Sequence, residues 1–395
     1  MENTAKRRKG PFPEPRGIGR SAASALLRGS GGMGTKPRAM RRASASIGKT
    51  SKSRIINAVA PIRICDLGGW TDTWFAETGS VCNIGVYPYA EVQVYAHPSP
   101  SKGRPRIVIN AENFGDRYAI DPDNIVYDRH PLLEASIDIL NLRGLSFEVN
   151  LFSQAPAGCS TGTSAAITVA LLGALDMLSE GRRTPHEIAE LAHRVETEKL
   201  GLQCGIQDQL CSAYGGICFI EMFRYPYASV SQVMVSNSFW WELERRLMLV
   251  FLGKSHSSSA THKEVIKRLE SPGADKSVLG KLRDAAYAGK NALYAEDIRA
   301  FGKAMISNTD AQAELHPALV SKDALRVIEL AKANGAVGWK VNGAGGEGGS
   351  LTILGPPERE RQRILAAEIQ RMEPRFRVIP TYLSRMGLRR WESAG

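Results

Sequence analysis

The pattern of apolar and polar positions divides the chain near residue 54. Residues 1–53 are rich in Arg, Gly, Ser and Pro and contain no sustained apolar period, so they cannot bury enough apolar surface to fold. From Arg54 onward, short alternating runs and helically spaced apolar positions follow one another. We therefore expect the folded part of the protein to begin at about this residue.

Both strands and helices are expected in the periodic part of the chain. Alternating or continuous short apolar runs predict strands over 55–60, 81–86, 90–96, 106–111, 145–151, 217–222, 246–252 and 375–382. Apolar positions three and four apart predict helices over 131–142, 165–178, 185–199, 207–214, 265–269, 278–288, 298–308, 323–334 and 358–372. Residues 338–354 indicate a strand, a Gly-rich loop and a second strand. Mixed elements without an internal repeat favour an α+β fold over a doubly wound sheet.

The length of 395 residues is enough for two domains. We expect one domain over residues 54–230 and a second over 231–395. Three interpretations of residues 1–53 stay open: a mis-assigned start, a disordered basic tail, and an organelle transit peptide. We favour the first because Met33 and Met40 are available downstream. The segment is rich in Arg and Ser and poor in acid, as transit peptides are, and it lacks the apolar region of a secretory signal.

The net charge of +11 resides in the N-terminal segment. Residues 1–54 hold 14 Lys and Arg against 2 Asp and Glu, a net of +12, which leaves −1 for the other 341 residues. A nearly neutral folded part gives no case for nucleic-acid binding. The six cysteines form neither a CxxC pair nor a zinc spacing with His, which indicates reduced thiols in a cytoplasmic protein. No apolar run approaches the ~18 residues of a membrane span.

The most informative stretch is QAPAGCSTGTSAAITVALL at residues 154–172. Pro156 and Gly158 begin a loop of small and hydroxyl residues that leads into an apolar helix. The first turn of a helix has free backbone N–H groups and the positive end of the dipole, and small residues let an anion approach them. The stretch is neither a Walker loop nor a GxGxxG motif. It predicts a phosphate-binding loop, with an ordinary Gly/Ser turn before a core helix as the alternative.

Three motifs occur in order along the chain: APIRICDLGGWTDT at 60–73, the small-residue loop at 156–165, and KVNGAGGEGG at 340–349. This order resembles the three-motif layout of the GHMP kinases, and the resemblance covers about residues 55–385. It implies an α+β, two-domain GHMP kinase fold. The N-terminal, ATP-binding domain is then ribosomal S5 domain 2-like and the C-terminal domain ferredoxin-like, with ATP in the cleft between them.

The details of the motifs are similar to the sugar kinase branch of that family. PAGCSTGTSAAITVALLGAL resembles the second motif of heptose 7-phosphate kinases and L-fucokinases, and ETEKLGLQCGIQDQ resembles a galactokinase stretch. Galactokinases carry Glu-His at the positions of Gly69-Trp70 in this chain, whereas GGWTDT is similar to fucokinase-type sequences. The first motif therefore argues against plain galactokinase activity.

The resemblance also implies roles for individual residues. Asp208 resembles the catalytic aspartate that orients or deprotonates the attacking hydroxyl. Arg63 resembles the arginine that keeps this aspartate ionised and offsets charge on the transferred phosphoryl group. Ser164 and Glu196, with Glu198 as the alternative, resemble the Mg²⁺ ligands. The implied ATP-binding residues are Pro156, Gly158, Cys159, Ser160, Thr161, Gly162, Thr163, Ser164 and Ala165. The implied substrate-binding residues are Asp72, Trp70, Gly343, Gly345 and Gly346.

Each of these assignments has a simpler structural alternative. Asp208 can be a helix N-terminal charge, Glu196 a solvated helix end and Asp72 a turn aspartate. Trp70 can pack in the core or present a platform to the face of a sugar. The glycines at 343–349 can form a simple hairpin. We assign no role to Glu347, and we expect His256, His262 and His316 to be surface or capping histidines.

The sequence therefore predicts an ATP- and Mg²⁺-dependent kinase that forms a sugar 1-phosphate from an L-fucose-like or heptose 7-phosphate-like substrate. The expected partners are a sugar or sugar phosphate, with no nucleic acid, no membrane, and a monomer or homodimer as the assembly. The alternatives are a catalytically silent sugar- or nucleotide-sensing protein, a nucleic-acid or membrane-surface protein acting through residues 1–53, and a decarboxylase or isoprenoid kinase. Intact Ser164, Glu196 and Asp208 favour an enzyme.

Overall fold

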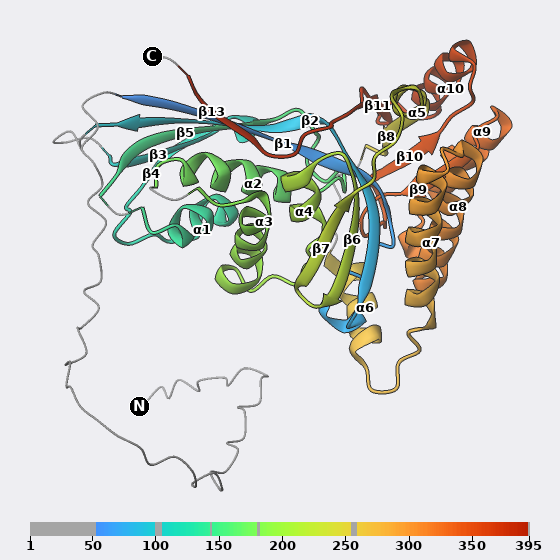
Figure 1. The fold of residues 1–395 in the computed structure, drawn as a ribbon, viewed down its shortest axis with the longest axis horizontal. Helices are drawn as coiled ribbons and strands as arrows, with labels where there is room; N and C mark the ends of the chain where they lie inside the picture. The colour runs from blue at the N-terminus through green and yellow to red at the C-terminus, as the bar shows by residue number, and fades with distance from the viewer. Residues whose placement is uncertain (1–52, 99–104, 143, 180–181, 254–258, 394–395) are drawn as a thin grey trace, which may run out of the picture. The chain divides into compact units, whose positions relative to one another are not determined.

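The computed structural model describes residues 53–98, 105–142, 144–179, 182–253 and 259–393 (Figure 1). The interpretations of the N-terminal segment and the expectation for His256 lie outside these residues. The described residues belong to one compact unit that spans Ile47–Gly395. No helix in the described part of the chain is long and apolar enough to cross a membrane.

Two long antiparallel strands, β1 (Arg54–Leu67) and β2 (Gly79–His97), organise the fold. The sequence predicted two separate strands in place of β2, and that prediction was wrong. A register shift between Pro61 and Ile62 of β1 lies opposite Pro88 of β2. Such a bulge leaves residues of β2 outside the pairing, so the strand continues past a proline that cannot donate to the ladder.

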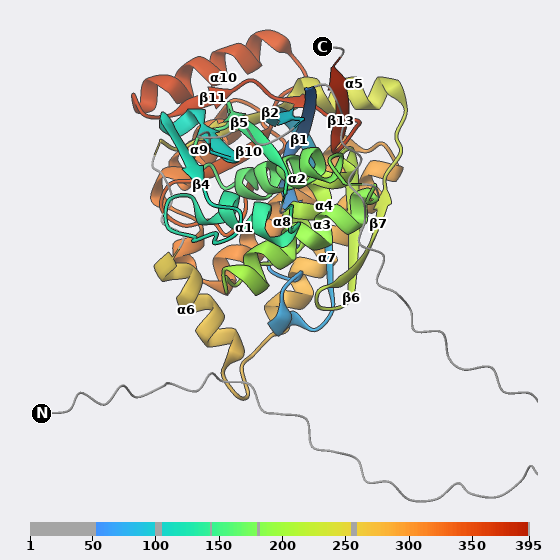
Figure 2. The ribbon, with the colours of Figure 1, turned by 90° about the vertical axis from the view of Figure 1, so that its left-hand side faces the viewer.

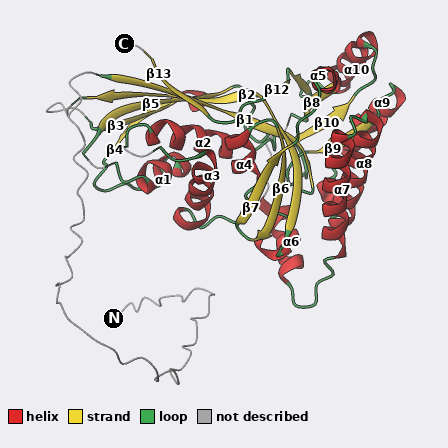
Figure 3. Cartoon of the chain, in the orientation of Figure 1, coloured by secondary structure: helices red, strands yellow, loops and turns green. Residues whose placement is uncertain are grey.

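The first sheet has nine strands, in the order β13-β1-β2-β5-β3-β4, with β6 and β12 also pairing with β2, and β7 with β6 (Figure 3). Its other strands are β3 (Ile107–Ala111), β4 (Asp116–Ile120), β5 (Ser146–Ser153), β6 (Ile217–Arg224), β7 (Tyr227–Gln232), β12 (Tyr382–Leu383) and β13 (Arg389–Ser393). β3 and β5 run parallel, and the other neighbours are antiparallel. β13 pairs with β1, so the C-terminal end of the chain completes a sheet that the N-terminal part begins.

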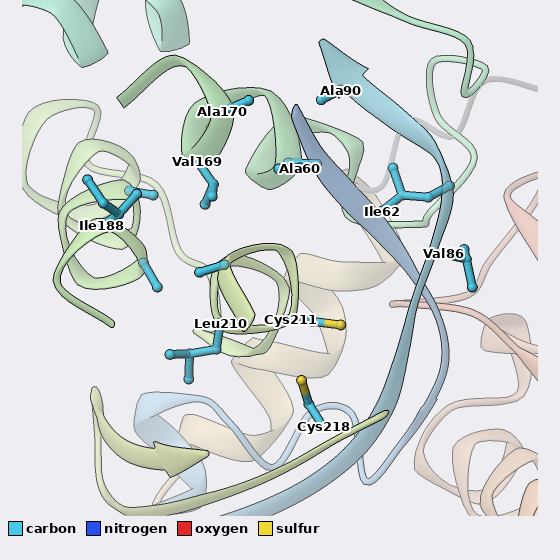
Figure 4. Packing of buried hydrophobic residues seen from close by; sticks show 14 of the residues in the cluster. Ala60, Ile62, Val86, Ala90, Val169, Ala170, Ile188, Leu210, Cys211 and Cys218 are labelled. Carbon is cyan, nitrogen blue, oxygen red and sulfur yellow. The ribbon is translucent and has the colours of Figure 1, made fainter. Parts of the chain in front are cut away.

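Helices α2 (Thr163–Asp176) and α4 (Gln207–Tyr214) pack directly on β1 and β2, and α1 (Pro131–Ile139) and α3 (Pro185–Arg194) pack on α2. Every residue of α2 from Thr168 to Asp176 is buried, which is typical of a helix that is apolar on all sides. Side chains from β1, β2 and these helices meet in one core (Figure 4). The core fixes the N-terminus of α2, and therefore the small-residue loop before it.

The second sheet has four strands, in the order β11 (Arg377–Ile379), β8 (Leu247–Phe251), β10 (Ser350–Leu354) and β9 (Gly338–Val341). The remaining helices are α5 (Asn237–Arg246), α6 (Ser259–Glu270), α7 (Ser277–Tyr294), α8 (Ile298–Leu315), α9 (Lys322–Ala333) and α10 (Arg359–Met372). α7 and α8 lie side by side (Figures 1 and 2). Val327 of α9 and Leu365 of α10 join the buried cluster of this sheet.

Most expected elements are confirmed, and α4 has the bounds that the sequence predicted. The sequence did not indicate β4, β7, α5 or β13, which are short or carry exposed polar positions. β7 crosses residue 230, where we placed the domain boundary, and β12 and β13 return to the first sheet. Residues 231–395 thus contribute strands to both sheets, and the two-domain division stays a prediction.

Candidate active site

A cavity of about 460 Å³ collects residues from distant parts of the chain. Its walls come from the end of β1 and the turn after it, the small-residue loop, the segment before α4, α6 and the late Gly-rich loop. The residues that line it are Arg63, Asp66, Trp70, Asp72, Thr73, Gly158, Cys159, Ser160, Thr161, Gly162, Thr163, Ser164, Ala165, Glu196, Gln203, Cys204, Gly205, Gln207, Asp208, Gln209, His262, Gly343 and Ala344.

The small-residue loop curves along one wall because three of its residues have positive φ. Gly158, Ser160 and Gly162 have φ of 74°, 56° and 67°, and Gly162 is the N-cap of α2. A Cβ on Gly162 would lie 3.1 Å from Oδ2 of Asp208, so glycine permits both the left-handed turn and the close approach. Of the nine predicted ATP-binding residues, the structure places eight in the cavity wall, and Pro156 lies outside it.

Arg63 and Asp208 both line the cavity and form an ion pair with two hydrogen bonds. The Arg63 Nε donates to Oδ1 of Asp208 at 2.8 Å and Nη2 donates to Oδ2 at 3.2 Å. The third nitrogen, Nη1, donates to the carbonyl oxygen of Ser160. Burial alone lowers the pKa of Arg63, but attraction to Asp208 and Asp66 outweighs it and raises the pKa. The guanidinium stays charged and holds the Asp208 carboxylate beside the small-residue loop.

Asp72 lies against the start of α4. The backbone N–H of Gln207 donates to its Oδ2 at 3.0 Å, and the Gln207 side chain donates to Oδ1 at 3.3 Å. Burial raises the pKa of Asp72 to about 6, opposed by the Gln207 N–H and supported by the nearby charge of Asp208. Asp72 and Asp208 thus face one cavity from segments more than a hundred residues apart in the chain.

The structure separates the two glutamates that the sequence offered as metal ligands. α3 begins with a capping box between Thr184 and Glu187 and continues into a π-helical turn, Val195–Lys199. Glu196 on this turn lines the cavity and accepts a hydrogen bond from Gln209 Nε2 at 2.7 Å. Glu198 instead pairs with Arg194 on the surface, with 57% of its side chain exposed. Of the two candidates, only Glu196 faces the cavity.

Glu196 is a carboxylate in a place that disfavours its charge. Burial raises its pKa to about 7, the Gln209 hydrogen bond opposes the rise, and the nearby charge of Asp208 adds to it. A bound cation would reverse this balance by favouring the ionised carboxylate. Within the described ranges, no group of three or more His, Cys, Asp or Glu is placed to hold a metal ion by itself.

The late Gly-rich loop meets the small-residue loop through Gly343. A Cβ on this glycine would lie 3.0 Å from the Ser160 carbonyl oxygen and 3.2 Å from Nη2 of Arg63. Gly345 and Gly346, which the sequence assigned to substrate, are not in the cavity wall. The N–H of Gly346 donates to the Leu319 carbonyl at 2.9 Å, and a Cβ on Gly345 would lie 2.2 Å from the same oxygen.

Asp66 is a buried carboxylate of the cavity that the sequence analysis missed. Both of its oxygens accept the N–H of Gly343 at 3.1 Å, and Oδ1 lies 3.4 Å from Nζ of buried Lys340. Lys340 and Arg63 lower the pKa of Asp66 against the effect of burial. Alternation could not single out Asp66, because every residue of β1 from Ala60 to Leu67 is buried and the pairing with β2 shifts register between Ile64 and Leu67.

His262 is the second residue that sequence reasoning misplaced. We expected a surface or capping histidine, but α6 places it in the cavity wall, where its ring centroid lies 4.9 Å from that of Trp70. Nothing in its local sequence could reveal this contact with a residue so distant in the chain. The expectation for His316 is confirmed, since its Nδ1 caps a short helical turn by accepting the N–H of Ala318 at 3.2 Å.

A second, apolar cavity of about 240 Å³ lies beside the first. Ala111, Phe114, Leu133, Phe152 and Ile167 contribute to its wall. Ser164 lines both cavities, so the apolar cavity adjoins the first turn of α2.

Comparisons with known proteins identify the family of the chain. The GHMP kinases N terminal domain matches residues 130–216. A mevalonate kinase of Thermococcus sibiricus is 30% identical over 245 residues, which cover 61% of this chain and 68% of that protein. The chain therefore belongs to the GHMP kinases, phosphotransferases that act on an alcohol group and use ATP as the phosphate donor.

Other relatives carry names of sugar kinases. The D-glycero-alpha-D-manno-heptose 7-phosphate kinase of Campylobacter jejuni is 25% identical over 328 residues, which cover 78% of this chain and 91% of the relative. The bifunctional fucokinase/GDP-fucose pyrophosphorylase of Arabidopsis thaliana is 25% identical over 319 residues, 76% of this chain but only 30% of that longer protein.

Solved structures confirm the predicted GHMP kinase fold. A D-glycero-D-manno-heptose 1-phosphate kinase from Bacteriodes thetaiotaomicron superposes with a TM-score of 0.68 at 21% identity, over 86% of this chain and all of that one. Galactokinase from Lactococcus lactis, complexed with galactose, superposes with a TM-score of 0.63 at 15% identity, over 85% and 95% of the two chains.

Proposed function

We propose that this protein is an ATP- and Mg²⁺-dependent sugar kinase that transfers the γ-phosphoryl group to a sugar hydroxyl, the anomeric one, and releases a sugar 1-phosphate. One observation carries the proposal: the Arg63–Asp208 pair lies beside the small-residue loop, in the same cavity as Asp72. A carboxylate, a guanidinium and a helix N-terminus are the elements that phosphoryl transfer requires, because the reaction depends on positioning and electrostatics.

The nucleotide site follows from the N-terminus of α2. Its first-turn N–H groups, at Thr163 and Ser164, offer donors to the phosphates of ATP. The apolar cavity that adjoins Ser164 has the size and lining to take the adenine ring, with Phe114 and Ile167 as apolar contacts. The phosphates would then reach from Ser164 toward Asp208 in the larger cavity.

Ser164 and Glu196 are the residues that would hold Mg²⁺. A hydroxyl and one carboxylate fit an ion that keeps several waters and takes its other oxygens from ATP phosphates. The raised pKa of Glu196 fits as well, since a buried carboxylate without a cation is disfavoured in its charged form. When bound, Mg²⁺ would neutralise part of the charge on the triphosphate.

The acceptor side rests on three residues. Asp208 accepts the proton of the attacking hydroxyl, and Arg63 keeps that carboxylate ionised and fixed in orientation through two hydrogen bonds. Arg63 also offsets the charge that develops on the transferred phosphoryl group. Asp72 accepts hydrogen bonds from other hydroxyls of the sugar and holds the reacting one near Asp208.

Several observations favour a sugar as the acceptor. GGWTDT at residues 68–73 resembles fucokinase-type sequences, and relatives of this chain are named as kinases of a heptose 7-phosphate and of fucose. L-fucose-like and heptose 7-phosphate-like acceptors are therefore the first to test.

The test is release of ADP by the purified protein with ATP and Mg²⁺ against a panel of acceptors. The panel holds L-fucose, D-galactose, L-arabinose, glucuronate, D-mannose and a heptose 7-phosphate, with mevalonate as the control from the other branch. One sugar with a high kcat/KM, and a 1-phosphate as its product by NMR, supports the proposal. Turnover of mevalonate alone refutes it. Binding of ATP without turnover of any sugar favours the silent sensing protein.

A further inference from the structure

We infer that Gln207 and Gln209, the two neighbours of Asp208 on α4, are positioning residues with separate tasks. The side-chain amide of Gln207 orients Asp72 for the acceptor, and the amide of Gln209 orients Glu196 for Mg²⁺. The inference rests on the proposed function and names the residues that hold its two ligand-binding carboxylates. It is carried by the hydrogen bonds at the start of α4 and by the distribution of ion pairs around the cavity.

The four carboxylates that line the cavity differ in their partners. Asp66 and Asp208 are each ion-paired with a buried Lys or Arg. Asp72 and Glu196 have no ion pair with any residue that the structure describes, and each accepts a side-chain amide from α4 instead. A neutral amide holds a carboxylate in one orientation without neutralising it, and the oxygens keep other lone pairs open. The two carboxylates to which the proposed function assigns ligands are therefore the two held by amides.

The first turn of α4 reaches three different elements. Successive residues of an α-helix point about 100° apart, so three consecutive side chains diverge. Gln207 Nε2 donates to Oδ1 of Asp72, on the turn after β1, at 3.3 Å. Gln209 Nε2 donates to Oε1 of Glu196, on the π-helical turn, at 2.7 Å. Asp208 lies between them and pairs with the arginine of β1. One helical turn therefore places the catalytic carboxylate and orients the two others.

The amide of Gln207 is held from both sides. Its Oε1 accepts a hydrogen bond from Nδ2 of buried Asn83 at 3.4 Å, which directs its Nε2 to Asp72. The backbone N–H of Gln207 donates to the other oxygen of Asp72 at 3.0 Å. Asp72 therefore keeps one anchor when the amide is removed, and the amide sets the direction of its second oxygen.

The amide of Gln209 contributes little to the stability of the fold. The residue is 1% exposed, and its Oε1 has no hydrogen-bond partner among the residues that the structure describes. A buried acceptor without a donor is destabilising, and native proteins rarely retain one without a reason. The partnered half of this amide is the one that donates to Glu196. A task at Glu196 explains why a glutamine occupies this buried position.

The test replaces single glutamines by methionine, which keeps an unbranched side chain of similar length and removes the amide. The variants are Gln207→Met and Gln209→Met, with Gln232→Met as the matched control. Gln232 Nε2 donates to the carbonyl oxygens of Tyr214 and Gly215, at 3.0 Å each, at the other end of α4. The control therefore removes an amide that supports the same helix but does not line the cavity.

Two affinities are measured by calorimetry: that for the sugar with the highest kcat/KM in the panel, and that for ATP with Mg²⁺ and with EDTA. We expect Gln207→Met to weaken sugar binding about tenfold, with the effect of Mg²⁺ on ATP affinity unchanged. Gln209→Met should reduce that effect of Mg²⁺ about tenfold and leave sugar affinity unchanged. Gln232→Met should lower the melting temperature and change neither affinity.

Double variants show whether each amide acts through its carboxylate. Once Asp72→Asn is present, adding Gln207→Met should cause no further loss of sugar affinity. Adding Gln209→Met to Glu196→Gln should likewise cause no further loss of the Mg²⁺ effect. Losses that add up in either double variant contradict the assigned positioning.

The outcomes separate this inference from the proposed function. Loss of both affinities in each variant, or of neither in a folded variant, overturns the inference and leaves the sugar kinase intact. If Gln207→Met does not fold, Asn83→Leu decides, because it frees the Gln207 amide to turn and should also weaken sugar binding. A Gln209→Met that does not fold contradicts the inference, since the amide would then be structural. Failure of every sugar overturns the proposed function itself, and the ATP measurements still test Gln209.

Discussion

Gly205 lies directly against the carboxylate of Asp72: a Cβ at residue 205 would fall 2.0 Å from Oδ2 of Asp72 and 2.6 Å from its Cγ. No side chain fits in this space while Asp72 keeps its hydrogen bonds to Gln207. The absence of a side chain at residue 205 therefore sets the position of a carboxylate that lies 133 residues earlier in the chain.

Gly205→Ala should displace Asp72 and weaken acceptor binding. We expect the acceptor KM to rise by up to about 100-fold, because moving a substrate-positioning group by about 1 Å can cost that factor. Overpacking should also lower the free energy of unfolding by about 1–3 kcal/mol. The control is Gly280→Ala on α7, where a Cβ meets nothing within 4 Å and should stabilise by about 0.5–1 kcal/mol. Equal kinetics in the two variants would contradict this role of Gly205.

Asp208→Asn should strongly reduce turnover without abolishing nucleotide binding. The amide keeps the shape of the side chain but cannot accept the proton, so we expect kcat to fall by about 10²–10⁴-fold. Arg63 retains its bond to the Ser160 carbonyl. Two measurements on the variant serve as controls and should both remain possible: the ATP affinity, determined by calorimetry, and the melting temperature. Retained turnover in a homogeneous sample would show that Asp208 is not the base.

Glu196→Gln and Glu198→Gln form a matched pair for the Mg²⁺ assignment. Glu196 lines the cavity, whereas Glu198 pairs with Arg194 on the surface. We expect Glu196→Gln to raise the Mg²⁺ concentration for half-maximal activity by roughly tenfold or more. Glu198→Gln should leave that concentration unchanged. A larger effect at Glu198 would reverse the assignment.

Acceptor binding should weaken as the pH falls through about 6. The pKa of Asp72 is raised to about 6, mainly by burial, so the carboxylate is ionised above that pH and protonated below it. A protonated carboxyl is a weaker acceptor for sugar hydroxyls, so the acceptor KM should rise between pH 7 and pH 5. Asp72→Asn should have a high KM that no longer changes over this range. The measurement is the acceptor KM at saturating ATP and Mg²⁺, which isolates this step from the titration of Glu196.

Asp66→Asn should destabilise the protein by leaving Lys340 without its charged partner. Lys340 is 1% exposed and also donates to Gln312 Oε1 at 3.2 Å. Removing one partner of a buried ion pair lowers the free energy of unfolding by about 3–5 kcal/mol, while replacing both charged residues often leaves it unchanged. We therefore expect urea denaturation to show a large loss for Asp66→Asn and recovery in the double variant with Lys340→Met. Additive losses in the double variant would contradict a direct pair.

Local sequence rules predicted the parts of the site that lie within one segment. The small-residue loop and the start of α2 follow from small residues before an apolar run, which the structure confirms. The start of α3 at Pro185 and the bounds of α4 follow equally from nearby residues. These features depend on steric and hydrogen-bonding preferences over a few residues, so the sequence alone determined them.

Tertiary structure decided which charged groups meet in the cavity. Glu196 and Glu198 are two residues apart, and only the π-helical turn and its packing direct the former inward. Asp66 and Lys340 are 274 residues apart, and His262 reaches Trp70 only because α6 packs on the turn after β1. Such contacts depend on how separate elements pack, which no local period encodes. The sequence by itself determined the loop and the helix ends, and the packing of the elements determined which charges share the cavity.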